Sequence, residues 1–416
     1  MSDPVGAGAG LVLQSFRGIR YDPSGLDLAA VTCPPYDVIG SAEAERLAAS
    51  EPHNLVHLTL AAATAPPEQR YAGAGARWRQ WQVDGVLRRD AAPALYVYEA
   101  RHGEHRQFGL VGAVGLRAPE ERVILPHEDV HPGPVADRLA QMQATDANLE
   151  PIFLVVPGFG GAGEVVARAT AAAPLVDVDA GETTYRLWAI TDQDALATVA
   201  SALRDQQALI ADGHHRYTAY RQLQAARHAD GRGAGPWDFG LAFVVDSDSY
   251  PPALQPIHRV AAGTPPSSVL ATVPPGVAVI DLGEHLEPAL AYAHRRDGTG
   301  HPVVMAGDGR YRLVTLPADP ADTQHCATWR ELDVTALQRW LADALRIPDE
   351  QLRFPHSATE AVTLATQTSG TAFLLNPPSV TAVHAIAAAG DRMPRKSTSF
   401  GPKPLGGLVM RSLAAP

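Results

Sequence analysis

A strand, a tight turn and a helix follow one another directly in the middle of this 416-residue chain, and this unit constrains the fold more than any other segment. The apolar run Leu209–Ala211 ends at Asp212, and Gly213 permits a sharp turn. One face of the following helix is apolar at helical spacing and is formed by Tyr217, Tyr220 and Leu223. Alternating patterns over 94–100 and 107–116 predict a hairpin. The sequence therefore predicts an α/β fold with mixed sheets.

The residues at this turn have the chemistry of an anion site. His214, His215 and Arg216 are expected at the helix N-terminus, where backbone N–H groups, the helix dipole and a guanidinium all attract phosphate. Asp212 could orient a histidine or hold Mg²⁺. The alternative is a capping aspartate with two surface histidines on an ordinary strand–helix turn.

Lysine is almost absent from this chain. Of the 34 basic side chains only Lys396 and Lys403 are lysines, and hydroxyl groups lie between them at Ser397, Thr398 and Ser399. A lysine ammonium is a compact charge on a flexible stem that can follow a moving phosphate, which a planar guanidinium cannot do. These residues are therefore candidates for phosphate binding. A polar loop with two leftover lysines is the alternative.

A second cluster follows an apolar stretch at residues 124–125. His127 with the two acids Glu128 and Asp129 could form a metal site or a general base with its orienting partner. His131 stands four residues after His127, and Arg138 follows shortly after. Prolines at 126 and 132 interrupt any helix here, so a helical zinc motif is a poor match. A charged surface loop would have the same composition.

A third motif is the proline-fixed turn of residues 33–39. Two prolines hold an extended turn that presents Tyr36 and Asp37 between apolar segments. Taken alone, such a motif is more often a structural turn than a site.

Composition limits the partners. The formal charge of −11 argues against general binding of nucleic acid or of an anionic membrane. Two cysteines give neither a disulfide framework nor a cysteine-rich metal site. No apolar run reaches the ~20 residues of a membrane span, and no signal-peptide pattern is present. We expect a cytoplasmic protein with a small-molecule substrate and no nucleic-acid or membrane partner; its oligomeric state does not follow from the sequence.

Five motifs in order carry a resemblance to a known family. They are Pro-Pro-Tyr-Asp-Val-Ile, His-Glu with a later Asp-Arg, Asn-Leu-Glu-Pro-Ile-Phe, Ala-Asp-Gly-His-His-Arg-Tyr and Met-Pro-Arg-Lys-Ser-Thr-Ser-Phe-Gly-Pro-Lys. This series resembles the family called domain of unknown function 1015, from about residue 16 to 408. The chain departs from the family at Gly401, where an aromatic residue is common, and at Val155, where a tyrosine often follows the Pro-Ile-Phe strand.

The Asp-Gly-His-His-Arg motif is also similar to the signature of ParB/sulfiredoxin-like folds, among which are kinases of free L-serine. This resemblance implies a ParB/sulfiredoxin-like core with insertions and a phosphoryl donor held by Gly213, His214, His215 and Arg216. We expect residues 1–10 to be disordered, 11–263 to form this core, 264–375 to form a smaller α/β segment after a proline-rich linker, and 376–416 to return to the site as a tail.

The expected activity is that of a small-molecule kinase that transfers a phosphoryl group from ATP, ADP or pyrophosphate to a hydroxyl compound such as L-serine, with Mg²⁺. Asp37 or Glu128 would be the base, and Asp212 or Glu128 the metal ligand. The remaining expected roles are phosphate binding or catalysis by His215, Lys396, Ser397, Ser399 and Lys403, and substrate binding by Tyr36, His127 and Arg138. Two alternatives stay open, namely a nucleotide-binding switch of the ParB kind and a phosphohydrolase.

Overall fold

The described part of the chain forms two compact units. The computed structural model describes residues 10–60, 70–274, 277–294, 300–318 and 322–414. Unit 1 consists of Met1–Pro252 and Pro402–Pro416, and unit 2 of Ala253–Gly401. Most of the N-terminal segment predicted to be disordered lies outside the described residues. The linker expected near residue 264 lies inside unit 2, because β14 already pairs with strands of that unit.

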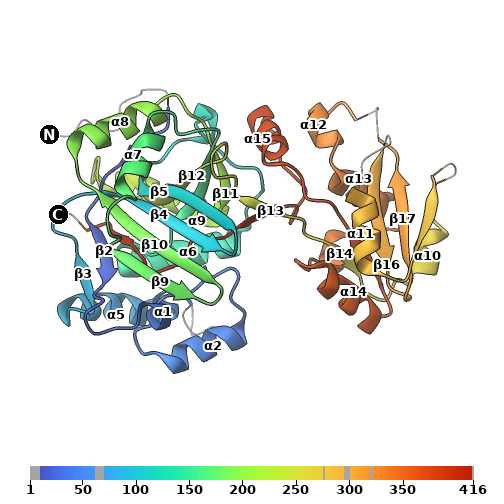
Figure 1. Cartoon of the computed structure of the whole chain (residues 1–416), viewed down its shortest axis with the longest axis horizontal. Coiled ribbons are helices and arrows are strands. Elements are labelled where there is room, and N and C mark those ends of the chain that lie inside the picture. Colours follow the sequence, from blue (N-terminus) through green and yellow to red (C-terminus); the bar gives the residue numbers. More distant parts are fainter. Residues whose placement is uncertain (1–9, 61–69, 275–276, 295–299, 319–321, 415–416) are drawn as a thin grey trace. The chain divides into compact units, whose positions relative to one another are not determined.

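Unit 1 is built on a large mixed sheet, which has nine strands among the described residues and the order β6-β11-β8-β12-β5-β4-β10-β9, with β1 beside β5 (Figure 1). Its strands are β1 (Leu13–Gln14), β4 (Leu95–His102), β5 (His105–Gly115), β6 (Ile124–Leu125), β8 (Ile152–Val156), β9 (Val176–Ala180), β10 (Thr183–Ile190), β11 (Ala208–Asp212) and β12 (Phe239–Asp246). The predicted hairpin is confirmed, since β4 and β5 pair antiparallel.

Helices complete unit 1. They are α1 (Leu28–Val31), α2 (Ser41–Ser50), α3 (Val56–Thr59), α5 (Ala72–Val83), α6 (Pro132–Thr145), α7 (Ala162–Ala169), α8 (Gln193–Leu203) and α9 (His214–Ala229), with 3₁₀ turns η1 (Pro119–Glu121) and η2 (Pro236–Asp238). Apolar residues of α6, α7, α8 and α9 pack with the large sheet in one buried core. Burial of this apolar surface is the main driving force that fixes α9 against the sheet.

A smaller sheet of unit 1 joins distant segments. It has the order β3-β2-β21-β7, formed by β2 (Gly18–Tyr21), β3 (Leu87–Arg89), β7 (Ala147–Asn148) and β21 (Met410–Ser412). Because β21 lies between β2 and β7, the C-terminal residues are an integral part of unit 1. Trp78 and Trp81 of α5 are buried in the core beside this sheet, as their helical spacing predicts.

Unit 2 is a separate α/β unit. Its strands are β13 (Ala253–Gln255), β14 (Arg259–Ala261), β15 (Val279–Gly283), β16 (His301–Ala306), β17 (Tyr311–Leu316), β18 (Leu352–Arg353), β19 (Thr371–Leu374) and β20 (Ser399–Gly401). Its helices are α10 (Pro266–Leu270), α11 (Leu286–His294), α12 (Ala327–Arg330), α13 (Asp333–Asp343), α14 (Ala358–Gln367) and α15 (Val380–Ala389), with η3 (Asp349–Gln351). The main sheet runs β15-β17-β16-β19-β14-β18, while β13 pairs with β20.

Several chain segments that the sequence analysis named as candidates lie at one end of the strands of the large sheet. Strands β6 and β11 are parallel neighbours and terminate at this end, whereas β8 is antiparallel to β11 and starts there. The segments that follow β6 and β11 and precede β8 therefore lie close together. Ligands of α/β sheets bind at strand ends of this kind.

The predicted mixed α/β architecture is confirmed. No helix in the described ranges is long and apolar enough to cross a membrane.

Candidate functional site

The turn between β11 and α9 requires glycine. Gly213 has φ of +93° and precedes the first residue of α9. A Cβ atom at this position would lie 3.0 Å from Cγ2 of Ile152 and 3.2 Å from Nε of Arg216. The left-handed backbone and the close packing together disfavour any side chain here. The sharp turn predicted at Gly213 is thereby confirmed.

Asp212, at the end of β11, lies between two cations. Its Oδ2 is 2.5 Å from Nη2 of Arg216, and its Oδ1 is 2.5 Å from Nζ of Lys403. Arg216 is 2% exposed and also donates through Nη1 to the carbonyl oxygen of Pro151 at 2.5 Å. The guanidinium thus ties the first turn of α9 to the residues just before β8.

Lys403 also reaches the proline-fixed turn. Its Nζ lies 2.9 Å from Oδ2 of Asp37, so one ammonium contacts two carboxylates. The side chain of Lys403 is 20% exposed and that of Asp37 is 34% exposed, which leaves both accessible to a ligand. Lys403, in the C-terminal segment expected to return to the site, thus contacts Asp37 and Asp212, and the roles assigned to these residues stay predictions.

Lys403 and Asp37 each stabilise the charged form of the other. Burial lowers the pKa of Lys403, but the carboxylates of Asp212 and Asp37 outweigh burial and raise it to about 12. Burial raises the pKa of Asp37, yet the positive charges of Lys403 and Arg216 bring it below its ordinary value. Near neutral pH the site thus holds the ammonium of Lys403 beside the ionised carboxylate of Asp37.

The histidines on either side of the site form two pairs. The backbone N–H of His127 donates to Nε2 of His214 at 3.3 Å, and that of His131 donates to Nε2 of His215 at 3.1 Å. Because Nε2 accepts in both cases, the neutral forms of His214 and His215 carry their proton on Nδ1. His127 is completely buried, and its Nδ1 lies 2.8 Å from the carbonyl oxygen of Ile210. The segment after β6 is thereby fastened to β11 and α9.

Arg138 is buried inside a polar network. It is 1% exposed, and its Nη2 donates to Thr59 O, the Tyr71 hydroxyl and Asp137 Oδ2 at 3.0, 2.7 and 2.6 Å. Its guanidinium lies over the ring of Tyr36, 3.9 Å from the ring centre. The partners of Arg138 and the burial of His127 do not support the direct substrate contact that we expected of both residues. Tyr36 is half-buried, so direct contact between its side chain and a substrate stays a prediction.

Glu150 is a site neighbour to which the sequence assigned no role. It is 4% exposed, accepts the backbone N–H of Tyr36 at Oε1 (3.0 Å), and lies 3.8 Å from Nη1 of Arg138 through Oε2. Burial raises its pKa despite the opposing charges of Arg216 and Arg138. The signal in the sequence is its place in the Asn-Leu-Glu-Pro-Ile-Phe motif, directly before Pro151 and the apolar strand β8.

Three predicted phosphate-binding residues belong to unit 2. Lys396 is exposed and has φ of +55°, Ser397 is 3% exposed and donates its hydroxyl to Pro394 O at 2.5 Å, and Ser399 starts β20. Their participation in one site with Lys403 stays a prediction.

The magnesium ligands predicted were Asp212 and Glu128. Glu128 is half-buried in the segment after β6. Across the described ranges, no group of three or more His, Cys, Asp or Glu side chains is placed to hold a metal ion. Both oxygens of Asp212 already contact cations, so its surroundings do not fit a metal ligand.

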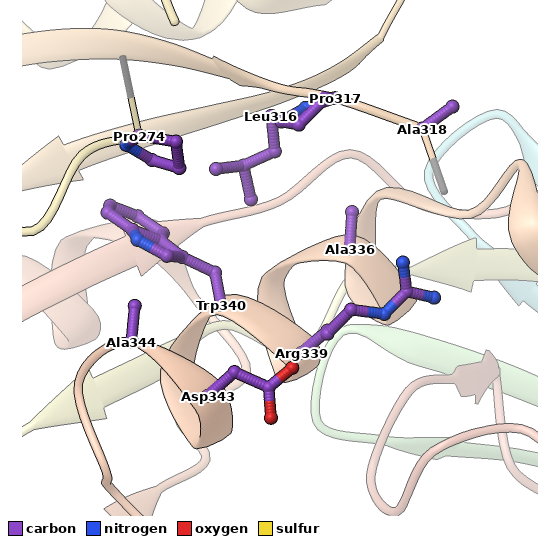
Figure 2. A pocket seen from close by; sticks show the side chains of 9 residues that line it. All are labelled: Pro274, Leu316, Pro317, Ala318, Ala336, Arg339, Trp340, Asp343 and Ala344. Atoms are coloured by element: carbon purple, nitrogen blue, oxygen red, sulfur yellow. The ribbon is translucent and has the colours of Figure 1, made fainter. Parts of the chain in front are cut away.

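A pocket in unit 2 contains none of the predicted residues. Figure 2 shows Trp340 facing Pro274 and Leu316, with Arg339 and Asp343 on the same helix, α13. Its volume is about 340 Å³. Its lining is mainly apolar and lacks the convergent charges found around Lys403.

Comparison with known proteins places the chain in a family. No curated protein matches its sequence. Solved structures with similarity include SbnI with a C-terminal truncation from Staphylococcus aureus, at 13% identity, a TM-score of 0.37 and coverage of 71% of this chain and 85% of that one. A free serine kinase in complex with AMP has 12% identity, a TM-score of 0.36 and coverage of 70% and 87%. A conserved hypothetical protein from Pyrococcus furiosus has 12% identity, a TM-score of 0.35 and coverage of 72% and 93%.

At such TM-scores these likenesses assign neither substrate nor mechanism to this chain. The family model is decisive instead, because it matches residues 13–335. This range contains the proline-fixed turn, the His-Glu segment and the Asp-Gly-His-His-Arg motif, whereas the lysine segment lies beyond it. The protein therefore belongs to the family described as "Protein of unknown function (DUF1015)", as its ordered motifs predict.

Proposed function

We propose that this protein is a phosphotransferase that moves a phosphoryl group from a nucleotide or pyrophosphate to the hydroxyl group of a small metabolite. The observation that carries the proposal is the position of Lys403 between Asp37 and Asp212 at the start of α9. An accessible ammonium, an accessible carboxylate and a helix N-terminus then share one edge of the sheet.

Lys403 and the first turn of α9 would hold the donor. Phosphoryl transfer spreads negative charge over the moving group, so catalysis depends mainly on positioning and on cations. The ammonium of Lys403 is charged near neutral pH, because its pKa is raised to about 12. N–H groups of a first helical turn have no acceptor within their helix and point toward an anion. His215, half-buried in this turn, would add a donor through Nδ1.

Asp37 would accept the proton of the substrate hydroxyl. The bond between the hydroxyl oxygen and phosphorus forms, the bond from phosphorus to the bridging oxygen of the donor breaks, and the proton passes to a carboxylate oxygen. A carboxylate whose pKa is lowered is a weak base, which suits a loose transition state in which proton transfer is late. Asp37 therefore chiefly orients the hydroxyl.

Arg216 would act through Asp212 rather than on phosphate directly. It is 2% exposed and is held by Asp212 and Pro151 O. Its guanidinium pairs with Oδ2 of Asp212, and Oδ1 of Asp212 in turn holds the ammonium of Lys403. We keep only Glu128 as the proposed Mg²⁺ ligand, with the remaining ligands supplied by water and donor phosphates, as is common for this ion.

A ³¹P NMR experiment tests this proposal. The purified protein is incubated with Mg²⁺, a panel of hydroxyl compounds that begins with L-serine, and ATP, ADP or pyrophosphate in turn. We expect a new phosphomonoester signal that depends on the acceptor and forms about 100-fold more slowly, but measurably, in Asp37→Asn. Asp177→Asn is the matched control, because Asp177 lies on β9, the last strand in the order of the large sheet, and pairs with Arg186 of β10.

The same spectra separate the alternatives. Donor breakdown that is independent of every acceptor would identify a phosphohydrolase. A donor that binds without turnover would support a nucleotide-binding switch. An unchanged donor that also fails to bind would contradict the proposal as a whole.

A further inference from the structure

Glu150 lies where several segments of unit 1 meet. Its carbonyl oxygen accepts the Tyr220 hydroxyl at 3.1 Å, and the next carbonyl, of Pro151, accepts Arg216. Its side chain accepts the Tyr36 N–H and faces Arg138. Residues 150–151 thus contact α6, α9 and the proline-fixed turn within one short segment.

Backbone groups of the proline-fixed turn form hydrogen bonds to other segments at two described points. At its start, Cys33 and Gly406 exchange backbone hydrogen bonds, with N···O distances of 3.4 and 2.9 Å. Beyond the two prolines, the Tyr36 N–H donates to Glu150. Asp37 is the next residue, so the bond to Glu150 is the anchor closest to the carboxylate that contacts Lys403.

We propose that Glu150 is a positioning residue that fixes the proline-fixed turn through the Tyr36 amide and thereby holds Asp37 beside Lys403. This role rests on the proposed function for what Asp37 does. Glu150 itself is 4% exposed, so it acts through Asp37 and does not touch substrate. A carboxylate that accepts a buried backbone N–H forms one of the stronger hydrogen bonds of a protein.

The chain provides a matched control in Glu99. This residue on β4 is 1% exposed and pairs with Arg106 and Arg186 at 2.7 and 3.5 Å. It is as deeply buried and as well paired as Glu150, but it has no contact with residues 33–37 among the described interactions. Glu99→Ala therefore reports the general effect of removing a buried ion pair.

Hydrogen–deuterium exchange tests the anchor without any assay of activity. In a peptide that covers residues 32–39, Tyr36 is the first residue after two prolines with an amide hydrogen, and electron-transfer fragmentation of this peptide separates its exchange from that of the amides of residues 37–39. Glu150→Ala should speed this exchange roughly tenfold or more, as expected for the loss of a hydrogen bond to a charged acceptor. Glu150→Gln keeps an acceptor oxygen and should exchange like the wild type. Wild-type exchange in Glu150→Ala, or equal acceleration in Glu99→Ala, would overturn the proposal.

Kinetics test the link to Asp37. Glu150→Ala should lower kcat about 100-fold, the effect of misplacing a reacting group by an ångström, and should leave the donor KM nearly unchanged. In an Asp37→Asn background, the same change should add less than about twofold, because both substitutions remove one function. Full additivity would overturn the positioning role. If the wild type transfers no phosphoryl group, the proposed function is wrong, but the anchoring role of Glu150 is not affected by this result. The exchange experiment still decides whether Glu150 anchors the turn.

Discussion

The ammonium of Lys403 lies 2.9 Å from Oδ2 of Asp37, a residue 366 positions earlier in the chain. The same ammonium reaches Asp212, and Gly406 pairs with Cys33 a few residues on. The C-terminal segment therefore contributes Lys403 to the candidate site and strand β21 to the smaller sheet. The site exists only when Pro402–Pro416 has docked on unit 1.

The two lysines should differ sharply in reactivity. Lys403 is 20% exposed and its pKa is raised to about 12, whereas Lys396 is exposed. Since each pKa unit changes the free amine tenfold, limiting acetic anhydride at pH 8 should label Lys403 at least ~10-fold more slowly than Lys396. Mass spectrometry of the acetylated peptides measures both rates. Asp212→Asn should accelerate labelling at Lys403 alone, and equal rates in the wild type would contradict the ion pairs.

Gly213→Ala should destabilise unit 1 more than a simple loss of glycine would. A left-handed backbone costs a non-glycine residue about 1–2 kcal/mol, and the new Cβ would press on Ile152 and Arg216 for about 1–3 kcal/mol more. Gly181→Ala is the control, because Gly181 has φ of +63° with no atom near its Cβ position. Urea unfolding of both variants isolates the packing component. Equal losses in the two would show that the turn has room for a side chain.

Acid should weaken the Asp37–Lys403 pair. The pKa of Asp37 in the folded protein is below its ordinary value, while in the unfolded chain it returns to about 3.9. The carboxylate therefore stabilises the fold above about pH 4, and this contribution is lost as pH falls through the lower folded value. The difference in unfolding free energy between wild type and Asp37→Asn should shrink from pH 6 to pH 3. In a Lys403→Met background this pH dependence should largely vanish.

The contribution of Glu150 to the free energy of unfolding should change with pH in the opposite direction to that of Asp37. Burial raises its folded pKa above the unfolded value of about 4.3, so its contribution to stability is full below that pH and declines as pH rises through the folded pKa. Wild type should therefore lose stability relative to Glu150→Gln between pH 4 and pH 8 in urea unfolding experiments. A difference that is constant with pH would mean that Glu150 titrates as it does in water.

The sequence predicts well what is encoded locally. The unit from Leu209 to Tyr217 was correct because strand, glycine turn and amphipathic helix each have a local pattern. The rarity of lysine made Lys403 a candidate site residue, and in the structure Lys403 contacts Asp212 at the end of β11. Both predictions depend on residue types that have few other reasons to occur where they do.

Partners brought together from distant segments could not be predicted. Arg138 meets Tyr71, Thr59 and Glu150 only in the folded protein, so its burial and the anchoring role proposed for Glu150 have no local signal. The unit boundary was misplaced for a similar reason. The prolines near residue 265 suggested a linker, but Pro266 starts α10 inside unit 2, because proline suits a first helical turn.

The most direct test of the account is the rate of phosphomonoester formation by Lys403→Met, measured by ³¹P NMR beside the wild type with the best donor and acceptor. Circular dichroism first establishes that both proteins are folded. We predict that the substitution lowers kcat/KM by about 10²–10³, as expected for removal of a group that stabilises charge in the transition state. Transfer by Lys403→Met at the wild-type rate would contradict the central claim that Lys403, held by Asp37 and Asp212, is part of the catalytic site.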